Sequence, residues 1–453
     1  MQPAHATRAT NTTAPAAPAT PPTPLLREPN FRWLMAGSAL SLLGDQFTLI
    51  ALPWLVLQMT GDTRVLGTVL ALVSVPRAVF ILLGGALVDR YSPKQVLMRT
   101  KYVNLVLLAC LSGLVATGQL NLALVYGLSL AIGLATAFSI PAATSMMPQV
   151  VARPQLQAAN GMSLGLRQLT MFVGPLAAGL LMLLFGDGRG SSGGGGGAVG
   201  HSTGIALAFA LDALSFGLSA WTLAKVRTLA TPAAPQAAAP AVLAAVAEGL
   251  AHCWRDRELR SCFLYWSAVA LFIMGPVQIA VPVLASSTGG LGAAAFGSLL
   301  GAHGAGTLAG MVLSGLLPRL RLRSLGLTIL LFDAVIGLLF MPMGLITALW
   351  QGVVLMLAIG LLGGFMQVRV FTWIQQRVPP ALIGRAMSLF MFIFMGLAPV
   401  SAAATGWVMQ SIGLPTLFMA CGGSLLLLVA LAFAMTPVRT IQDADPAARG
   451  RGA

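Results

Sequence analysis

Three ionisable residues interrupt long apolar runs of this sequence and are its first candidates for chemistry. Asp45 lies in the apolar segment 31–59, and Arg77 and Arg167 lie in two later segments of the same kind. A charged side chain is expensive to bury, and desolvation favours the protonated form of a carboxylate. Asp45 is therefore predicted to exchange a proton or to recognise a cation. The alternative is a structural ion pair with Arg77 or Arg167, two arginines that could instead bind an anionic group.

Two glutamines, Gln46 and Gln278, also lie within apolar runs. An amide side chain in an apolar segment needs hydrogen-bond partners. Both glutamines are therefore candidates for a substrate site shared with Asp45, although packing between helices is the plainer explanation.

The common signatures of enzymes and metal sites are missing from the sequence. None of Lys94, Lys101 and Lys225 follows the glycine spacing of a phosphate-binding loop, which argues against ATP hydrolysis. The four histidines and four cysteines form no HExxH or CxxC motif, so no metal ion and no other cofactor is predicted. The protein is not expected to be an enzyme.

Composition indicates which elements must position these residues. Of the 453 residues, 57% are hydrophobic and 8% are charged, whereas soluble proteins have about 25% charged residues. So few charges cannot cover a water-exposed surface, and most of the surface must face a lipid bilayer. The net charge of +14 does not indicate nucleic-acid binding, because the basic residues separate apolar runs and do not gather on one face.

Apolar runs of about 20 residues are long enough to cross a bilayer as helices. They predict an all-α integral membrane protein of about twelve transmembrane helices. The predicted spans are 31–59, 65–88, 98–118, 121–141, 158–185, 204–224, 261–285, 291–317, 325–342, 344–371, 386–409 and 412–435.

The basic residues predict the orientation of these spans. Of the 26 lysines and arginines, only Arg64 and Arg189 fall in the loops on one side, and three more fall within spans. The remaining 21, Lys101 among them, fall on the other side. Positively charged loops stay in the cytoplasm. The sequence thus predicts a multi-pass protein of the plasma (inner) membrane with both termini cytoplasmic.

A weak repeat and a long linker divide the chain. Pro154 and Pro379 lie 225 residues apart, as do two copies of the tripeptide Met-Ser-Leu, which favours two related six-helix halves. The loop 186–203 is rich in glycine and is predicted to be flexible. The predicted organisation is a disordered cytoplasmic tail (1–30), an N-terminal six-helix bundle (31–224), a cytoplasmic linker loop (225–260), a C-terminal six-helix bundle (261–435) and a cytoplasmic tail (436–453).

The stretch GALVDRYSPK (residues 85–94) follows the second predicted span and resembles the loop signature of the major facilitator superfamily. The resemblance implies two six-helix bundles around a central cavity, with transport by alternating access. It also implies a gating motif of Gly85, Asp89, Arg90 and Lys94, in which Asp89 caps a helix or pairs with a cation. Ser92 replaces the usual glycine, so the turn departs from the family pattern. The alternative is a loop that only sets the orientation.

The fifth predicted span contains GPLAAG (residues 174–179). It resembles the antiporter motif of drug exporters in Gly174, Pro175 and Gly179. Small residues permit close helix packing, and proline bends a helix. The motif favours export by exchange, but generic packing would use the same residues.

Further stretches resemble the branch of this superfamily that holds macrolide efflux pumps and enterobactin exporters. They are GDQ (44–46), ALPW (51–54), LDALSF (211–216), QRVPP (376–380) and GRAMS (384–388). The resemblance implies a proton-coupled exporter of small amphipathic molecules of the drug, macrolide or siderophore type, acting as a monomer in the lipid bilayer. The alternatives are an uptake carrier or lysophospholipid flippase of the same fold, or a membrane sensor that transports nothing.

Overall fold

The computed structural model describes residues 24–90, 92–152, 155–185, 203–228, 250–287, 292–317, 324–379 and 382–442. Within helices, the side chains of residues 78–90 and of a few other positions are outside this description. The predicted tails, the glycine-rich loop 186–203 and the linker 225–260 therefore lie outside the described residues in large part.

The described part of the chain is helical, which confirms the predicted all-α class. Its first six long helices are α1 (Pro29–Thr60), α2 (Thr63–Arg90), α3 (Pro93–Ala116), α4 (Leu122–Val150), α5 (Leu156–Phe185) and α6 (Thr203–Lys225). Its later long helices are α8 (Arg257–Ser287), α9 (Gly292–Leu316), α10 (Leu325–Phe340), α11 (Leu349–Arg377), α12 (Ile383–Val408) and α13 (Leu414–Met435). The short 3-10 turns are η1 (Leu25–Arg27), η3 (Met341–Leu345) and η4 (Pro437–Thr440).

The lengths and hydropathy of the helices fit a membrane protein. Within the described residues, eleven helices are long and apolar enough to span a membrane, and α2, with 28 residues, is the other long helix. Most ends lie close to the predicted ones. The exceptions are α4, which continues past 141 to Val150, and α11, which continues past 371 to Arg377. Backbone hydrogen bonds extend a helix beyond its apolar stretch, so hydropathy alone underestimates helix length.

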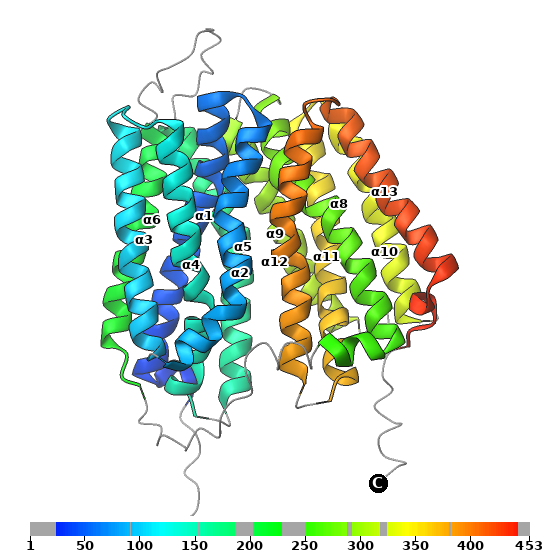
Figure 1. Cartoon of the computed structure of the whole chain (residues 1–453), viewed down its shortest axis with the longest axis horizontal. Helices are drawn as coiled ribbons and strands as arrows, with labels where there is room; N and C mark the ends of the chain where they lie inside the picture. Colours follow the sequence, from blue (N-terminus) through cyan, green and yellow to red (C-terminus); the bar gives the residue numbers. More distant parts are fainter. Residues whose placement is uncertain are drawn as a thin grey trace, which may run out of the picture.

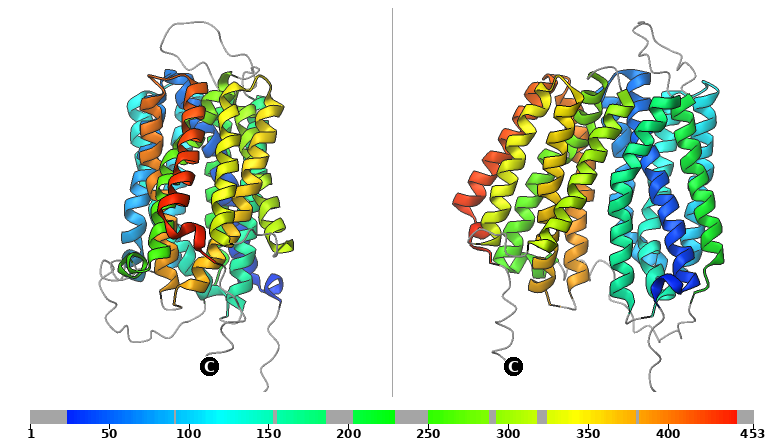
Figure 2. Two further views of the ribbon diagram at one scale, coloured as in Figure 1. Left: turned by 90° about the vertical axis from the view of Figure 1, so that its right-hand side faces the viewer. Right: turned by 180° about the vertical axis from the view of Figure 1, so that it is seen from behind.

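Helices α1 to α6 form one group and α8 to α13 a second group beside it, with α5 packed on α9 and α2 on α12 between the groups (Figure 1). We call these groups the N-half and the C-half. The start of α1 and the turn η4 lie toward the same end of the molecule, which we call the termini end (Figure 2).

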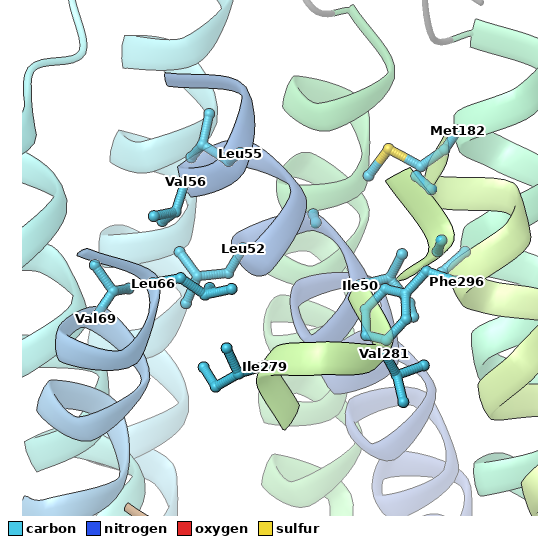
Figure 3. Packing of buried hydrophobic residues seen from close by; sticks show 14 of the residues in the cluster. Ile50, Leu52, Leu55, Val56, Leu66, Val69, Met182, Ile279, Val281 and Phe296 are labelled. Carbon is cyan, nitrogen blue, oxygen red and sulfur yellow. The ribbon is translucent and has the colours of Figure 1, made fainter. Parts of the chain in front are cut away.

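The two halves touch in the part of the molecule away from the termini end. There Thr63 of α2 donates a hydrogen bond of 3.0 Å to the carbonyl of Gly406 on α12. Gly179 of α5 lies against Gly297 of α9 without an intervening side chain. Buried apolar residues of α1, α2, α5, α8 and α9 form one cluster in this region (Figure 3). The halves therefore share a packed core at this end.

The contacting face of α12 is open nearer the termini end. Ala402 and Gly406 contact α2. Met391 and Met395 precede them by eleven residues, about three turns, and so lie on the same face. The two methionines are 37% and 43% exposed. This face is therefore covered at one end of α12 and uncovered at the other.

Helix α5 shows the same change along its length. Phe172 and Leu176 contact α9. Gly161 and Gly165 precede them by eleven residues on the same face, and nothing lies within 4 Å of a Cβ built at either position. The two halves are thus closed at one end and open at the termini end, in agreement with their separation in Figure 1.

Candidate functional site

Asp45 lies at the middle of α1, where its sequence neighbours hold the helix against two others. Gly44 faces α6 so closely that a methyl group there would overlap the Asp212 side chain. Gln46 is buried and packs over Gly174 of α5. Asp45, between these two contacts, is exposed. A carboxylate in the middle of a membrane-length helix is thus left uncovered by its neighbours.

Arg77 lies at the depth of Asp45 on the neighbouring helix. Helices α1 and α2 run antiparallel and are joined by a tight turn. Asp45 is 15 residues from Thr60, and Arg77 is 14 residues from Thr63. At 1.5 Å per residue, both lie about 21–23 Å from that end of their helices. The Nε of Arg77 is buried and has no hydrogen-bond partner among the described residues.

Arg167 lies on α5, which runs parallel to α1 in a constant register. Ser163 meets Met35, and Gly174 meets Gln46, in each case at an offset of 128 residues. Arg167 is therefore level with residue 39, about 9 Å nearer the termini end than the carboxylate at position 45. Its side chain is exposed.

These charges act on one another without forming a bonded pair. The positive charges of Arg77, Lys101 and Arg167 all interact with the Asp45 carboxylate. Within the described residues, Asp45 makes no ion pair within 4.0 Å. Among the described residues, the structure therefore does not contain the alternative, a structural ion pair between Asp45 and an arginine.

The positive-inside pattern predicts Lys101 among the cytoplasmic cations, and this is wrong. Lys101 is only 7% exposed and points into the N-half. Its ammonium donates to Ser219 (2.5 Å) and Ser41 (3.3 Å) and lies 5.7 Å from the centre of the Phe216 ring. The signal was available, because Lys101 precedes the buried Leu108 by seven residues, two helical turns, on one face. Twenty basic residues remain on the predicted cytoplasmic side.

Asp212 of α6 is buried at 1% exposure behind Asp45. Thr48 of α1 donates to one of its carboxylate oxygens, and Ser215 donates to the other at 3.3 Å. Both oxygens thus have partners, and the residue ties α1 to α6.

The antiporter-like residues Gly174, Pro175 and Gly179 all lie at helix contacts. Gly174 accommodates Gln46, whereas Pro175 and Gly179 face the other half of the molecule. A Cβ built at Gly297 of α9 would overlap the Pro175 carbonyl and lie 2.8 Å from the Gly179 Cα. Small residues here allow α5 and α9 to pack backbone to backbone.

Three of the four residues of the gating motif, Gly85, Asp89 and Arg90, end helix α2, and their side chains lie outside the described ones. Lys94, at the start of α3, donates to the carbonyls of Val226 (2.6 Å) and Ala224 (3.4 Å). A lysine at a helix C-terminus satisfies free carbonyls and complements the helix dipole. Lys94 thus fastens α3 to the end of α6 within the N-half.

Gln278 of α8 is half-buried, and no hydrogen bond to another described residue involves it. Elsewhere in the C-half, the hydroxyl of Tyr265 donates to Asp333 of α10 at 2.7 Å. Asp333 is thus tied to α8 and lies apart from the charges of the N-half.

A polar link that the sequence did not reveal joins the halves at the closed end. Gln410 donates to Asp62 at 2.9 Å and accepts from Arg64 at 3.0 Å. The Arg64 guanidinium also lies 5.6 Å from the centre of the Trp407 ring. Asp62 and Gln410 are 348 positions apart, so no local pattern connects them.

A second charged cluster lies at the termini end of the C-half. Arg377 contacts Asp256 at 2.8 Å and Glu258 at 2.7 Å. Partial burial raises the pKa of Asp256, but hydrogen bonds from Arg377 and from the backbone N–H groups of Leu259 and Glu258 outweigh it. The pKa of Asp256 therefore lies below its ordinary value.

Comparison with known proteins agrees with this architecture. Residues 34–402 match the major facilitator superfamily. The chain is 25% identical over 416 residues to the multidrug efflux pump Tap of Mycobacterium tuberculosis and of Mycobacterium bovis, covering 87% of this chain and 90% of the relative.

Among solved structures, the chain is similar to a point mutant of the nucleoside transporter NupG, with a TM-score of 0.71 at 12% identity over 90% of this chain and 99% of that one. It is also similar to an auto-inhibited POT family peptide transporter, with a TM-score of 0.70 at 12% identity over 92% and 98%. A bacterial homologue of the iron transporter ferroportin, in an inward-facing state, gives 0.63 at 16% identity over 90% and 99%. At these identities the structures show a shared fold. The chain belongs to the major facilitator superfamily and is a multi-pass membrane transporter rather than an enzyme.

Proposed function

We propose that this protein exports small amphipathic molecules in exchange for protons, by alternating access across the plasma membrane with both termini in the cytoplasm. The observation that carries the proposal is Asp45, an exposed carboxylate at mid-helix that forms no ion pair among the described residues. Ionisable groups at this depth in a membrane protein commonly serve proton or substrate pathways. As access alternates, such a group can take up a proton from one side and release it to the other.

The contacts between the halves support alternating access. The α5–α9 contact includes close approaches of small residues and backbone, represented by Gly179 and Gly297. At these positions no side chains interlock across the contact, so this part of the shared core can open as the halves move. In this fold one half rocks against the other around a central site. The open termini end then corresponds to the state that loads substrate from the cytoplasm.

The direction and substrate class rest on two further points. The relative named as a multidrug efflux pump supports export. Met391 and Met395 present flexible, polarizable surface on the open face of the C-half, and such surface adapts to varied apolar molecules.

The test is accumulation of dyes and macrolides in cells that lack their main efflux pumps. We expect the protein to lower accumulation, a protonophore to abolish the effect, and Asp45→Asn to behave like the empty vector. Asp62→Asn is the matched control, because it removes a half-buried carboxylate at the closed end, away from mid-helix, and keeps an oxygen for Gln410. Proton-coupled export by Asp45→Asn at the wild-type rate would refute the role of Asp45. No protonophore-sensitive difference for any compound would refute export.

A further inference from the structure

We infer that the substrate is a zwitterionic amphiphile, whose acidic group binds Arg77 and Arg167 and whose basic group binds Asp45. This inference rests on the proposed function and names the class of molecule that it would carry. It stands on three charges of the N-half that are accessible and lie at neighbouring depths.

The ionisable groups around Asp45 divide into two kinds. Lys101 and Asp212 are buried and have hydroxyl partners on their own half of the molecule. Asp45 and Arg167 are exposed, and Arg77 is half-buried. Two guanidinium groups and one carboxylate thus remain available, with an excess of one positive charge. A ligand that complements this set carries an acidic group and a basic group.

The accessible charged groups do not pair with one another, so each remains able to bind a ligand. No side-chain hydrogen bond or ion pair involves Arg77 or Arg167 within the described residues. The buried Nε of Arg77 has no hydrogen-bond partner among the described residues, so one donor of its guanidinium group is unsatisfied. A guanidinium binds carboxylate or phosphate oxygens in a bidentate manner, which makes an anionic group the natural partner. The acidic group would bind between Arg77 and Arg167, which differ in depth by about 9 Å.

A simple organic cation does not fit this arrangement. Its approach to Asp45 would be opposed by the charges of Arg77, Lys101 and Arg167, which all act on that carboxylate. Like charges brought together in a site of low dielectric constant repel strongly. The acidic group of a zwitterion removes this penalty by neutralising the arginines.

A simple anion does not fit exchange with protons. Protonation of Asp45 would leave the positive charge of the arginines less balanced, so the protein would bind an anion more tightly. By the same linkage, the anion-bound protein would bind a proton more tightly. A proton and an anion coupled in this way would cross the membrane in the same direction, which is cotransport and not exchange. A basic group on the substrate instead competes with the proton for Asp45, and competition for one carboxylate is what exchange requires.

The test uses purified protein in liposomes with an acidic interior and three probes that share one dansyl body. Nε-dansyl-lysine is a zwitterion, its methyl ester is a cation, and its Nα-acetyl derivative is an anion. After subtraction of uptake by protein-free liposomes, which removes passive trapping of the weakly basic ester in the acidic interior, we expect the zwitterion to accumulate at least tenfold faster than either derivative. Arg77→Gln and Arg167→Gln should each reduce its rate at low concentration about tenfold, since a hydrogen bond to a charged group is lost. Arg77→Lys should retain part of the rate, and Arg439→Gln, an exposed arginine far from the site, should retain all of it.

The outcomes separate this inference from the function on which it rests. If the ester moves as fast as the zwitterion, or if the arginine variants leave the ranking of the probes unchanged, the inference is wrong. It is also wrong if dyes or macrolides are exchanged for protons in the same liposomes while the zwitterion is not. If no compound of either set moves, the proposed export itself fails. Size-exclusion profiles like that of the wild type are required of each variant, and Arg77→Lys carries the test if Arg77→Gln does not fold.

Discussion

One methyl group added at Gly297 should shift the protein towards the conformation in which the end that is closed in this structure is open. A Cβ at this position would overlap the Pro175 carbonyl and lie 2.8 Å from the Gly179 Cα. Carbon atoms in contact rest about 3.5–4.0 Å apart, so α5 and α9 must separate by about 1 Å. Overpacking of this kind costs about 1–3 kcal/mol. The contact joins the two halves at the closed end, so the penalty destabilises the conformation in which that end is closed.

A penalty of this size changes the ratio of the two conformations by about 5- to 150-fold. Spin labels at Thr117 and Thr347 would report the separation of the halves at the closed end, and labels at Gln95 and Thr440 would report it at the termini end. All four positions are exposed, and Cys110, the exposed cysteine, would be replaced by serine. In Gly297→Ala, more molecules should show a long distance at the first pair and a short distance at the second.

Gly315→Ala is the matched control, because it lies on the same helix and nothing is within 4 Å of a Cβ built there. It accounts for the general effect of replacing a helical glycine, which is itself about 0.5–1 kcal/mol. The reasoning is refuted if Gly297→Ala and Gly315→Ala both give the wild-type distances at the two ends.

Gln410→Ala removes the hydrogen bonds that link the halves at the closed end, each worth about 1 kcal/mol, and should raise the population open at that end several-fold in the same label experiment; unchanged distances would contradict it. Lys101→Met keeps the side-chain length but removes a buried charge, so the melting temperature of the purified protein should not fall. A decrease of more than about 5 °C, roughly 1 kcal/mol or more for a chain of this size, would show that the hydrogen bonds of Lys101 outweigh its burial cost. Because the folded-state pKa of Asp256 lies below its ordinary value of about 3.9, its contact with Arg377 stabilises the fold above that pH and loses this effect as pH falls through the folded value. The melting temperature of Arg377→Ala should therefore be lower than that of the wild type at pH 7, by an amount worth up to about 1 kcal/mol, and the difference should shrink steadily below pH 4; a difference that stays constant would refute this assignment.

The sequence predicts the helices of this protein well because each helix must by itself present enough apolar residues to cross the bilayer. A span needs an apolar run of sufficient length, and that requirement is written in consecutive residues. Asp45 could be singled out for the same reason, since a carboxylate stands out within such a run. Lys101 was misplaced because it lies near a predicted boundary, where hydropathy does not separate a buried lysine from a loop lysine. Its partners, Ser41 and Ser219, lie on two other helices.

Contacts between distant helices are the part that one sequence does not contain. Gln410 and Asp62 are common polar residues near helix ends, and nothing about either indicates the other. The glycines of α9 likewise fit generic packing, and only the fold shows that Gly297 faces Gly179. The GPLAAG stretch predicts close approach of some helix, whereas the identity of that helix depends on how the halves dock.

The position of the free charges relative to the contacts between the halves suggests how binding could drive the cycle. Asp45, Arg77 and Arg167 belong to the N-half, and the exposed Met391 and Met395 belong to the facing surface of the C-half. A ligand with charged groups on one side and an apolar body on the other would contact both halves at the open end and favour their approach. The contacts at the closed end, a shared apolar core with small residues and a few polar links, oppose separation, and the approach of the halves around the ligand offsets that cost. Binding energy gained at one end can therefore open the other, and a ligand that lacks either its charges or its apolar body should bind without being carried.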